Sequence, residues 1–381
     1  MRILATCSLG GAGHWVPLSD FLRASTGDED EVLVVAPPAL REMVEQWGFD
    51  YAAGGEPPEA LVAPIRERLP IAPPAEASVL GNRELFARLA ATAMLPGVEA
   101  ACTRWMPDLV VRDPCEYAAA VVAADRSIRS AQIGISLAEV EWGSLAVASP
   151  ALEAHRSGLT AEIARAPYVT RFPTAFDPSP FASTFRYRQP AGPTPEPLPD
   201  WWGDRSTPLV YLTLGTVLPY MTFAADTYRL LLRALADLDV RVLLTVGSTF
   251  DIGRLGSVPA NAHVEPWVDQ RRALAEATVT VCHGGSGTVL GALDAGVPMV
   301  VLPSFSDQHT NARVVERHRL GLVVDPSPDR GADAPFGERD LLRVTAAVRT
   351  ILDDPSSFTP AIGEPRDEVL SAADVLRRLM T

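Results

Sequence analysis

The sequence predicts an α/β protein built from two Rossmann-like, doubly wound parallel-sheet domains that face a cleft. The chain has 381 residues, which suits two domains of about 150 residues or more each. Short apolar runs alternate with helix-length segments in both halves, a pattern typical of crossover units on parallel sheets covered on both faces. Five prolines between Gln189 and Asp200 separate the halves, and such a stretch can continue neither a helix nor a central strand.

The elements follow in chain order from these apolar runs. In the first half we expect strands over residues 3–7, 31–36, 108–111 and 130–134, with helices over 21–24, 38–48, 84–105 and 117–124. In the second half we expect strands over 209–214, 240–246, 278–282, 299–302 and 320–324, with helices over 223–238, 287–295, 311–318, 338–352 and 368–380. The predicted organisation is a first domain over 1–188, a semi-rigid linker over 189–202, a second domain over 203–362 and a C-terminal helical segment over 363–381.

Composition excludes several classes of function. All 33 basic residues are arginine, so a P-loop lysine and a Schiff-base lysine are absent. The formal charge of −14 argues against nucleic acid and anionic membrane surfaces as partners. The first residues form a strand pattern rather than a signal peptide, and no apolar run reaches 18 residues, so we expect no membrane insertion and a cytoplasmic location.

A glycine-rich turn is the sharpest local feature. The strand over 278–282 runs into a histidine, three glycines and two hydroxyl residues, and a helix follows: His283, Gly284, Gly285, Ser286, Gly287 and Thr288. Glycine lets the backbone approach a ligand, and the unpaired N–H groups of the next helix attract an anion. A tight strand-to-helix turn that merely needs glycine is the alternative. A second turn, Gly215-Thr216, ends the first strand of the same domain and could hold the same diphosphate from the other side.

Two further loops follow strands of the second domain. Trp267 and Val268 lie after a short strand, and a loop tryptophan can stack a flat base, although an ordinary partly buried tryptophan is an equal alternative. Asp307 and Gln308 follow the strand over 299–302, and their side chains suit a hydroxyl-rich ring. Asp307 is also placed to cap the next helix, and both roles are compatible.

The candidate base is His14, which follows the first strand through a glycine-rich turn and precedes the first helix. Asp113 ends the strand over 108–111 and is the natural carboxylate to orient the imidazole, with Glu116 as the second choice. The alternative for His14 is a helix-capping histidine. We expect no metal and no cofactor, because the acidic pairs Asp28/Asp30 and Asp237/Asp239 lie in polar turns that indicate solvated loops.

The second half of the chain resembles the nucleotide-sugar-binding half of GT-B glycosyltransferases. The resemblance lies in four stretches and in their order along the chain: Gly215-Thr216, Trp267-Val268, His283–Thr288 and Asp307-Gln308. The likeness is greatest to actinobacterial enzymes that attach deoxysugars to polyketide and related aglycones. It is strong over residues 265–324, recognisable over 11–17 and weak over 56–105, the region that shapes the acceptor pocket in such families. The resemblance implies that the first domain binds the acceptor, that the second binds the donor, and that the last helix crosses back to the first.

The resemblance also implies roles for the candidate residues. His283 and its glycine turn would hold the diphosphate together with Gly215 and Thr216, Trp267 and the Val268 backbone would bind the base, and Asp307 and Gln308 would bind the sugar. His14 would act as general base with Asp113, and the sugar would move with inversion to a small hydrophobic acceptor. Plant members carry a ribose-binding glutamate where this chain has Gly291, which favours a dTDP-sugar over a UDP-sugar donor. Asp269 stands where proline is common.

Two other functions remain open at this point. A nucleotide-sugar epimerase shares the two-domain fold, but it needs several acid/base groups around the sugar. The sequence offers only Asp307 as such a group, which argues against this function. A catalytically inactive helper subunit would keep the fold alone, and the presence of His14, Asp113 and the phosphate turn argues against it.

Overall fold

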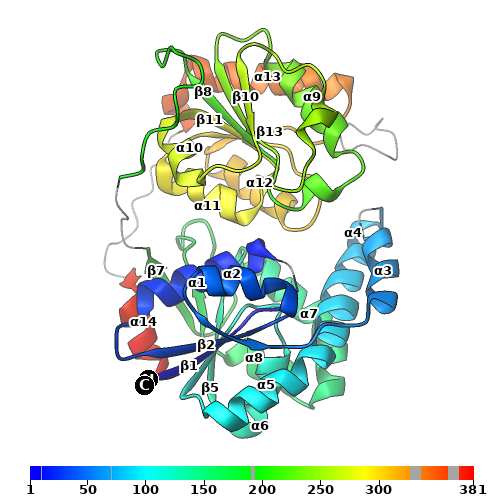
Figure 1. The fold of residues 1–381 in the computed structure, drawn as a ribbon, viewed down its shortest axis with the longest axis vertical. Coiled ribbons are helices and arrows are strands. Elements are labelled where there is room, and N and C mark those ends of the chain that lie inside the picture. Colours follow the sequence, from blue (N-terminus) through cyan, green and yellow to red (C-terminus); the bar gives the residue numbers. More distant parts are fainter. Residues whose placement is uncertain (10, 70, 190–193, 327–335, 359–368) are drawn as a thin grey trace. The chain divides into compact units, whose positions relative to one another are not determined.

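The computed structural model describes residues 1–9, 11–69, 71–189, 194–326, 336–358 and 369–381, which form two α/β units (Figure 1). Unit 1 comprises Met1–Ala191 and Glu364–Thr381, and unit 2 comprises Gly192–Gly363. Parts of all four predicted segments lie outside the described residues: 10 and 70 of the first domain, 190–193 of the linker, 327–335 and 359–362 of the second domain, and 363–368 of the C-terminal segment.

Unit 1 is built on an eight-stranded sheet with the order β14-β7-β6-β5-β4-β1-β2-β3, and every pair in it is parallel. Its strands are β1 (Arg2–Thr6), β2 (Glu31–Ala36), β3 (Asp50–Ala53), β4 (Leu109–Arg112), β5 (Arg129–Ile133), β6 (Tyr168–Thr170), β7 (Thr184–Arg188) and β14 (Leu370–Ser371). Its helices are α1 (Ala12–Ser25), η1 (Pro38–Leu40), α2 (Arg41–Gln46), α3 (Glu59–Arg68), α4 (Pro74–Ser78), η2 (Val79–Ala90), α5 (Ala91–Trp105), α6 (Ala118–Arg126), α7 (Ala138–His155), α8 (Leu159–Arg165) and α14 (Ala372–Leu379).

Unit 2 is built on a six-stranded parallel sheet with the order β10-β9-β8-β11-β12-β13. Its strands are β8 (Leu209–Thr213), β9 (Arg241–Thr245), β10 (Ala262–Glu265), β11 (Ala277–Cys282), β12 (Met299–Val301) and β13 (Gly321–Val323). Its helices are η3 (Leu218–Tyr220), α9 (Ala224–Leu235), η4 (Ile252–Leu255), α10 (Gln270–Glu276), α11 (Ser286–Ala295), α12 (Gln308–Arg317), α13 (Glu338–Asp353) and η5 (Pro355–Phe358). The predicted class of two parallel-sheet α/β domains is confirmed.

Both faces of each sheet are buried, as parallel sheets require. In β1, the alternating residues Ile3 and Ala5 belong to one apolar cluster while Leu4 belongs to another on the opposite face. At about 25 cal/mol per Å² of apolar surface, burial on both faces is the main contribution to the stability of the fold.

Several elements differ from the prediction. The first helix was expected over 21–24, but α1 begins at Ala12 and includes His14 in its first turn. Pro17 lies inside this helix, which continues through it because proline removes only one backbone hydrogen bond. The strands β3, β6, β7 and β14 and the helices α3, α7 and α8 were not predicted. In α7 the apolar residues do not gather on one side, and Pro150 interrupts the pattern.

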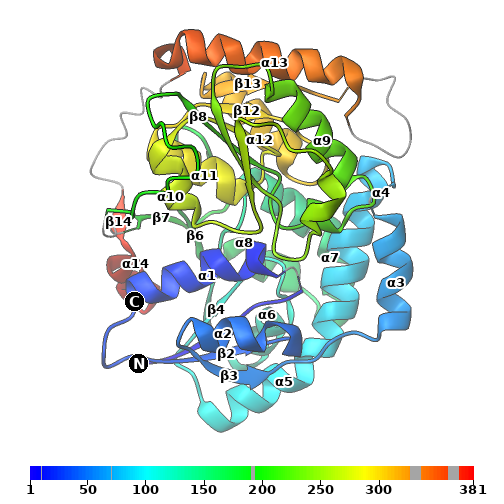
Figure 2. The same cartoon turned by 45° about the horizontal axis from the view of Figure 1, so that its top comes forward.

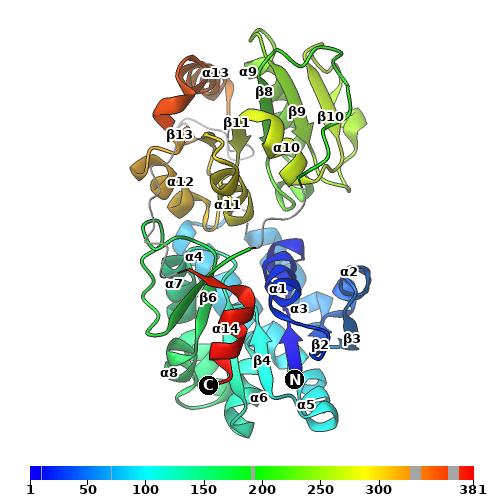
Figure 3. The same cartoon turned by 90° about the vertical axis from the view of Figure 1, so that its left-hand side faces the viewer.

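The C-terminal helix α14 belongs to unit 1, where it packs beside α1 and β7 (Figure 3). The preceding β14 pairs with β7 through Leu370 and Ser371. On another side of unit 1, α3 lies beside the long helical stretch of α4, η2 and α5 (Figure 2). That stretch, Pro74–Trp105, is the one helix among the described residues that is long and apolar enough to cross a membrane, a test that core helices also pass.

Candidate active site

The strand order reverses at one point in each sheet. In unit 1, β1 lies between β2 and β4, and in unit 2, β8 lies between β9 and β11. Helices that follow such neighbouring strands leave in opposite directions, which opens a crevice at the carboxyl ends where α/β proteins bind ligands. His14 and Asp113 follow β1 and β4, and Gly215 and His283 follow β8 and β11. These four predicted residues therefore lie at the reversal point of their own sheet.

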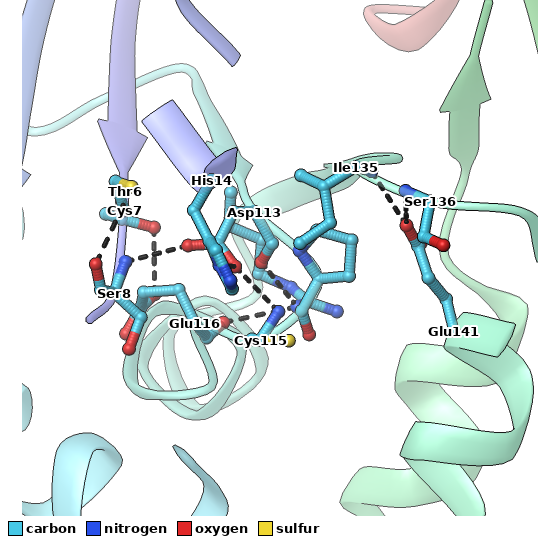
Figure 4. Close-up of polar contacts among 12 residues, drawn as sticks. Thr6, Cys7, Ser8, His14, Asp113, Cys115, Glu116, Ile135, Ser136 and Glu141 are labelled. Carbon is cyan, nitrogen blue, oxygen red and sulfur yellow. Dashed lines mark hydrogen bonds and ion pairs between the residues drawn. The ribbon is translucent and has the colours of Figure 1, made fainter. Parts of the chain in front are cut away.

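In unit 1, His14 and Asp113 are in contact (Figure 4). His14 Nδ1 lies 3.2 Å from Asp113 Oδ1. The fully buried Asp113 carboxylate also accepts hydrogen bonds from the backbone N–H groups of Ser8 and Cys115, each at 2.7 Å. Burial raises the pKa of Asp113, but the His14 charge and these hydrogen bonds outweigh it, so the pKa is lowered overall. An ionised carboxylate only accepts, so a neutral His14 carries its proton on Nδ1 and leaves Nε2 free to take another.

A buried arginine holds the loop that presents Asp113. Arg112 Nη1 donates to the carbonyl oxygens of Asp113, Pro114 and Glu116 at 3.0–3.1 Å, and Nη2 donates to Gln132 Oε1 at 3.1 Å. Burial lowers the pKa of this guanidinium, and the neighbouring acidic groups oppose the effect. Arg112 was not predicted as a site residue, since its role depends on its burial and on the conformation of the loop at residues 113–116.

Glu116, the second candidate for the partner of His14, has another role. Its carboxylate accepts from Thr6 Oγ1 at 2.8 Å and from the backbone N–H groups of Ala118 and Ala119 at 2.9 and 3.0 Å. It therefore caps α6 and ties this helix to β1. Burial raises its pKa, and the hydrogen bonds from Thr6 and Ala119 oppose the effect.

Cys115 joins the dyad in space, although no sequence spacing indicated it. The ligand atoms of His14, Asp113 and Cys115 all lie within 4.8 Å of one another, a geometry that could hold a metal ion. Burial and the Asp113 charge raise the pKa of the Cys115 thiol well above its usual value. The thiol is therefore protonated and a weak ligand at neutral pH.

In unit 2, the imidazole of His283 lies between the two glycine turns. A Cβ atom would lie 2.6 Å from His283 Nε2 if added to Gly215, and 2.3 Å from it if added to Gly285. Gly215 also has φ +73°, a conformation that favours glycine. Burial lowers the pKa of His283 to about 4, against the opposing charge of Asp307, so this imidazole is neutral at pH 7.

The helix after the glycine turn begins at Ser286, with Gly285 as its N-cap and with Gly287 and Thr288 in its first turn. Ser286 Oγ donates to Asp307 Oδ2 at 2.7 Å. Asn311, in α12, was not predicted: its Nδ2 lies 2.8–2.9 Å from the Gly284 carbonyl oxygen, Ser286 Oγ and Asp307 Oδ2. This amide joins the glycine turn at residues 283–288 to the loop that carries Asp307.

The residues predicted for the sugar have internal partners. Asp307 occupies the N-cap position of α12, but its side chain makes no cap bond and instead contacts Ser286 and Asn311. The buried Gln308 uses Oε1 to accept from the backbone N–H groups of Ser304 and Phe305 at 2.9 and 3.2 Å.

The base-binding candidates lie in the loop between β10 and α10. Trp267 is 71% exposed, which leaves its ring available for stacking, and Val268 is partly buried. Thr216, in the other turn, is exposed. Asp269 accepts from the Arg271 N–H at 2.9 Å and caps α10, which accounts for an aspartate at this position.

Comparison with known proteins identifies the family. Residues 229–374 match the family model of the C-terminal domain of erythromycin biosynthesis protein CIII-like proteins. L-demethylnoviosyl transferase of Streptomyces niveus is 31% identical over 364 residues, covering 93% of this chain and 90% of that protein. Elloramycin glycosyltransferase ElmGT of Streptomyces olivaceus is 31% identical over 395 residues, covering 100% and 97%. The chain belongs to the antibiotic glycosyltransferases. It is a sugar-transferring enzyme of the natural-product type, as the sequence resemblance predicted.

The fold of this glycosyltransferase has solved counterparts. Spinosyn rhamnosyltransferase SpnG, complexed with thymidine diphosphate, superposes with a TM-score of 0.70 at 20% identity, covering 100% of this chain and 96% of that one. The glycosyltransferase thus has the GT-B fold. Its units carry two separate polar clusters, one around His14 and Asp113 and one around His283 and Asp307.

Proposed function

We propose that this glycosyltransferase moves a sugar from a nucleotide-sugar to a hydroxyl group of a hydrophobic aglycone by direct displacement with inversion. The observation that carries the proposal is the contact of 3.2 Å between His14 and Asp113 at the reversal point of the unit 1 sheet. An imidazole held in one tautomer by a buried carboxylate is suited to general base catalysis, which contributes about 10²–10⁴-fold in rate.

In the proposed reaction, Nε2 of His14 takes the proton of the acceptor hydroxyl. The oxygen attacks the anomeric carbon as the bond from that carbon to the diphosphate breaks, and the diphosphate leaves with the electron pair. The turn at Gly284 and Gly285 and the N-terminus of α11 would stabilise the leaving charge. Because His283 is neutral at pH 7, it would act as a hydrogen-bond donor rather than a cation.

A dTDP-sugar is the favoured donor in this proposal. Gly291 carries no ribose-binding carboxylate, and a Cβ atom there would lie 2.9 Å from Gln270 Nε2 and 3.1 Å from a methyl group of Leu274. A side chain at this position would therefore require the ends of these two α10 side chains to move. A 2′-deoxyribose has one hydroxyl fewer to satisfy, which agrees with the loss of the glutamate. The complex of SpnG with thymidine diphosphate supports the same nucleotide.

The base assignment is tested with His14→Ala. We expect the variant to lose most of its turnover while binding the nucleotide as the wild type does, because His283 and its turns belong to the other unit. Undiminished turnover would reject His14 as the base. Sugar transfer by the purified single chain would separate the enzyme from an inactive helper, and the family assignment favours transfer over epimerisation.

The nucleotide assignment has its own test. Calorimetric titration with dTDP and with UDP should give the lower dissociation constant for dTDP. Equal or tighter binding of UDP would remove the dTDP preference and leave the base assignment untouched.

A further inference from the structure

An aromatic ring covers one face of the proposed base. The rings of His14 and Phe86 stack with their centroids 5.4 Å apart and their planes inclined by 28°. Phe86 belongs to η2, far from His14 in the sequence, and no motif linked the two residues. In this geometry the phenyl ring restricts the rotation of the imidazole and excludes water from one of its faces.

The helix that carries Phe86 has an uncommon conformation. The segment η2 is a π-helix of 12 residues, inserted between the α-helices α4 and α5. π-Helical turns are rare, and where they occur they often serve a functional site, because they change which side chains share a face. The conformation of η2 thus helps to determine that Phe86, rather than a neighbouring residue, faces His14.

The position of η2 is fixed from its other side by α7. Ala87 is fully buried in the cluster that also holds Leu145 and Leu152 of α7. The carbonyl oxygen of Ala87 lies 2.9 Å from His155 Nε2, at the C-terminal end of α7. A carbonyl oxygen only accepts, so the imidazole of His155 donates this bond. The residue that follows Phe86 is therefore held by both apolar packing and a hydrogen bond.

We infer that Phe86 is a positioning residue for His14, an inference that rests on the proposed role of His14 as base. Two restraints act on the imidazole from different directions. Asp113 Oδ1 lies 3.2 Å from Nδ1, and Phe86 stacks on a face of the ring. Together they keep Nε2 in one place, which matters because a base contributes only within hydrogen-bond reach of its proton.

The test compares two substitutions in η2. Phe86→Leu keeps an apolar side chain but removes the flat ring, and we expect it to lower kcat about threefold to tenfold with the KM for the nucleotide-sugar unchanged. Phe86→Tyr keeps the ring and should retain a kcat close to that of the wild type. Leu85→Ala is the matched control: Leu85 packs against the separate cluster of Val62 and Ile65, so its loss affects helix packing without touching the base. Melting temperatures show whether each variant is folded.

A double-mutant comparison shows whether Phe86 acts through His14. In a His14→Ala background, measured at higher enzyme concentration, Phe86→Leu should cause no further loss of kcat. A loss that persists in that background, or a Phe86→Leu effect no larger than that of Leu85→Ala, overturns the inference while leaving the proposed function intact. Wild-type turnover in His14→Ala alone overturns the base assignment and this inference with it.

Discussion

Replacement of Asp113 by asparagine tests the His14–Asp113 pair most directly, since it changes charge and hydrogen bonding but hardly any volume. The carboxylate accepts three hydrogen bonds, from Ser8 N–H on Oδ2 and from Cys115 N–H and His14 on Oδ1. An asparagine has only one acceptor oxygen. In one orientation its NH₂ group faces the Ser8 N–H at 2.7 Å, and in the other it faces Cys115 N–H and His14 Nδ1.

Both orientations have a predictable cost. Loss of a charge-assisted hydrogen bond to a buried group costs about 1.5–3 kcal/mol, so the variant should be less stable by an amount of this order. In the second orientation the NH₂ group donates to Nδ1 and moves the proton of His14 to Nε2, which blocks the proposed base. We expect kcat to fall on the order of 10²-fold, and less than in His14→Ala.

The assay follows product formation by chromatography at saturating donor, together with thermal unfolding between pH 3 and pH 8. The Asp113 pKa lies below its ordinary value of 3.8, so the carboxylate stabilises the fold above that value, and the contribution is lost as pH falls through the folded pKa. The stability difference between wild type and variant should therefore close in acid. Asp50→Asn, at an exposed site in the same unit, is the control. Unchanged kcat together with unchanged stability would refute the reasoning.

Three further predictions concern other parts of the chain. Gly215→Ala should weaken dTDP binding about tenfold in calorimetry, because the added Cβ atom would displace His283. Gly203→Ala is the control: Gly203 has the same φ of +73°, but a Cβ atom added there would have no neighbour within 4 Å, so this variant should bind dTDP normally. Asn311→Ala should raise the KM for the nucleotide-sugar several-fold in steady-state kinetics, and an unchanged KM would show that the glycine turn at residues 283–288 does not depend on this amide. Burial raises the pKa of Glu141 from 4.5 to about 8, so wild-type unfolding free energy should fall by up to about 1.4 kcal/mol per pH unit between these values, whereas Glu141→Gln should show a flatter profile in denaturant titrations.

Local sequence predicts those parts of the fold that depend on local pattern. The strand over 31–36 was predicted with the bounds that β2 has, since six mostly apolar residues follow an acidic turn and end before two prolines. β14 lies at the other extreme: it has two residues and exists only because it pairs with β7, about 180 positions earlier in the chain. No property of Leu370 and Ser371 alone indicates a strand.

The same distinction applies to the candidate site. The positions of Asp113 and the glycine turns could be predicted because each closely follows a strand, and that of His14 because the loop after β1 leads to it; side chains there reach the ligand edge of a parallel sheet. Asn311 and Phe86 could not, because their contacts with Gly284 and with His14 join parts of the chain that meet only after folding. Arg112 could not either: its partners are carbonyl groups that follow it closely in the sequence, but its burial depends on the fold.

The return of the chain to unit 1 makes unit 2 a continuous insertion within a discontinuous domain. Met1 and Met380 line one shared cavity, so both ends of the polypeptide meet on the same unit (Figure 2). A chimera that borrows unit 2 of a relative should therefore be spliced twice, near Gly192 and near Gly363, and not once at the proline-rich segment. A single splice would replace α14 as well and give β7, α1 and their neighbours a foreign helix to pack against.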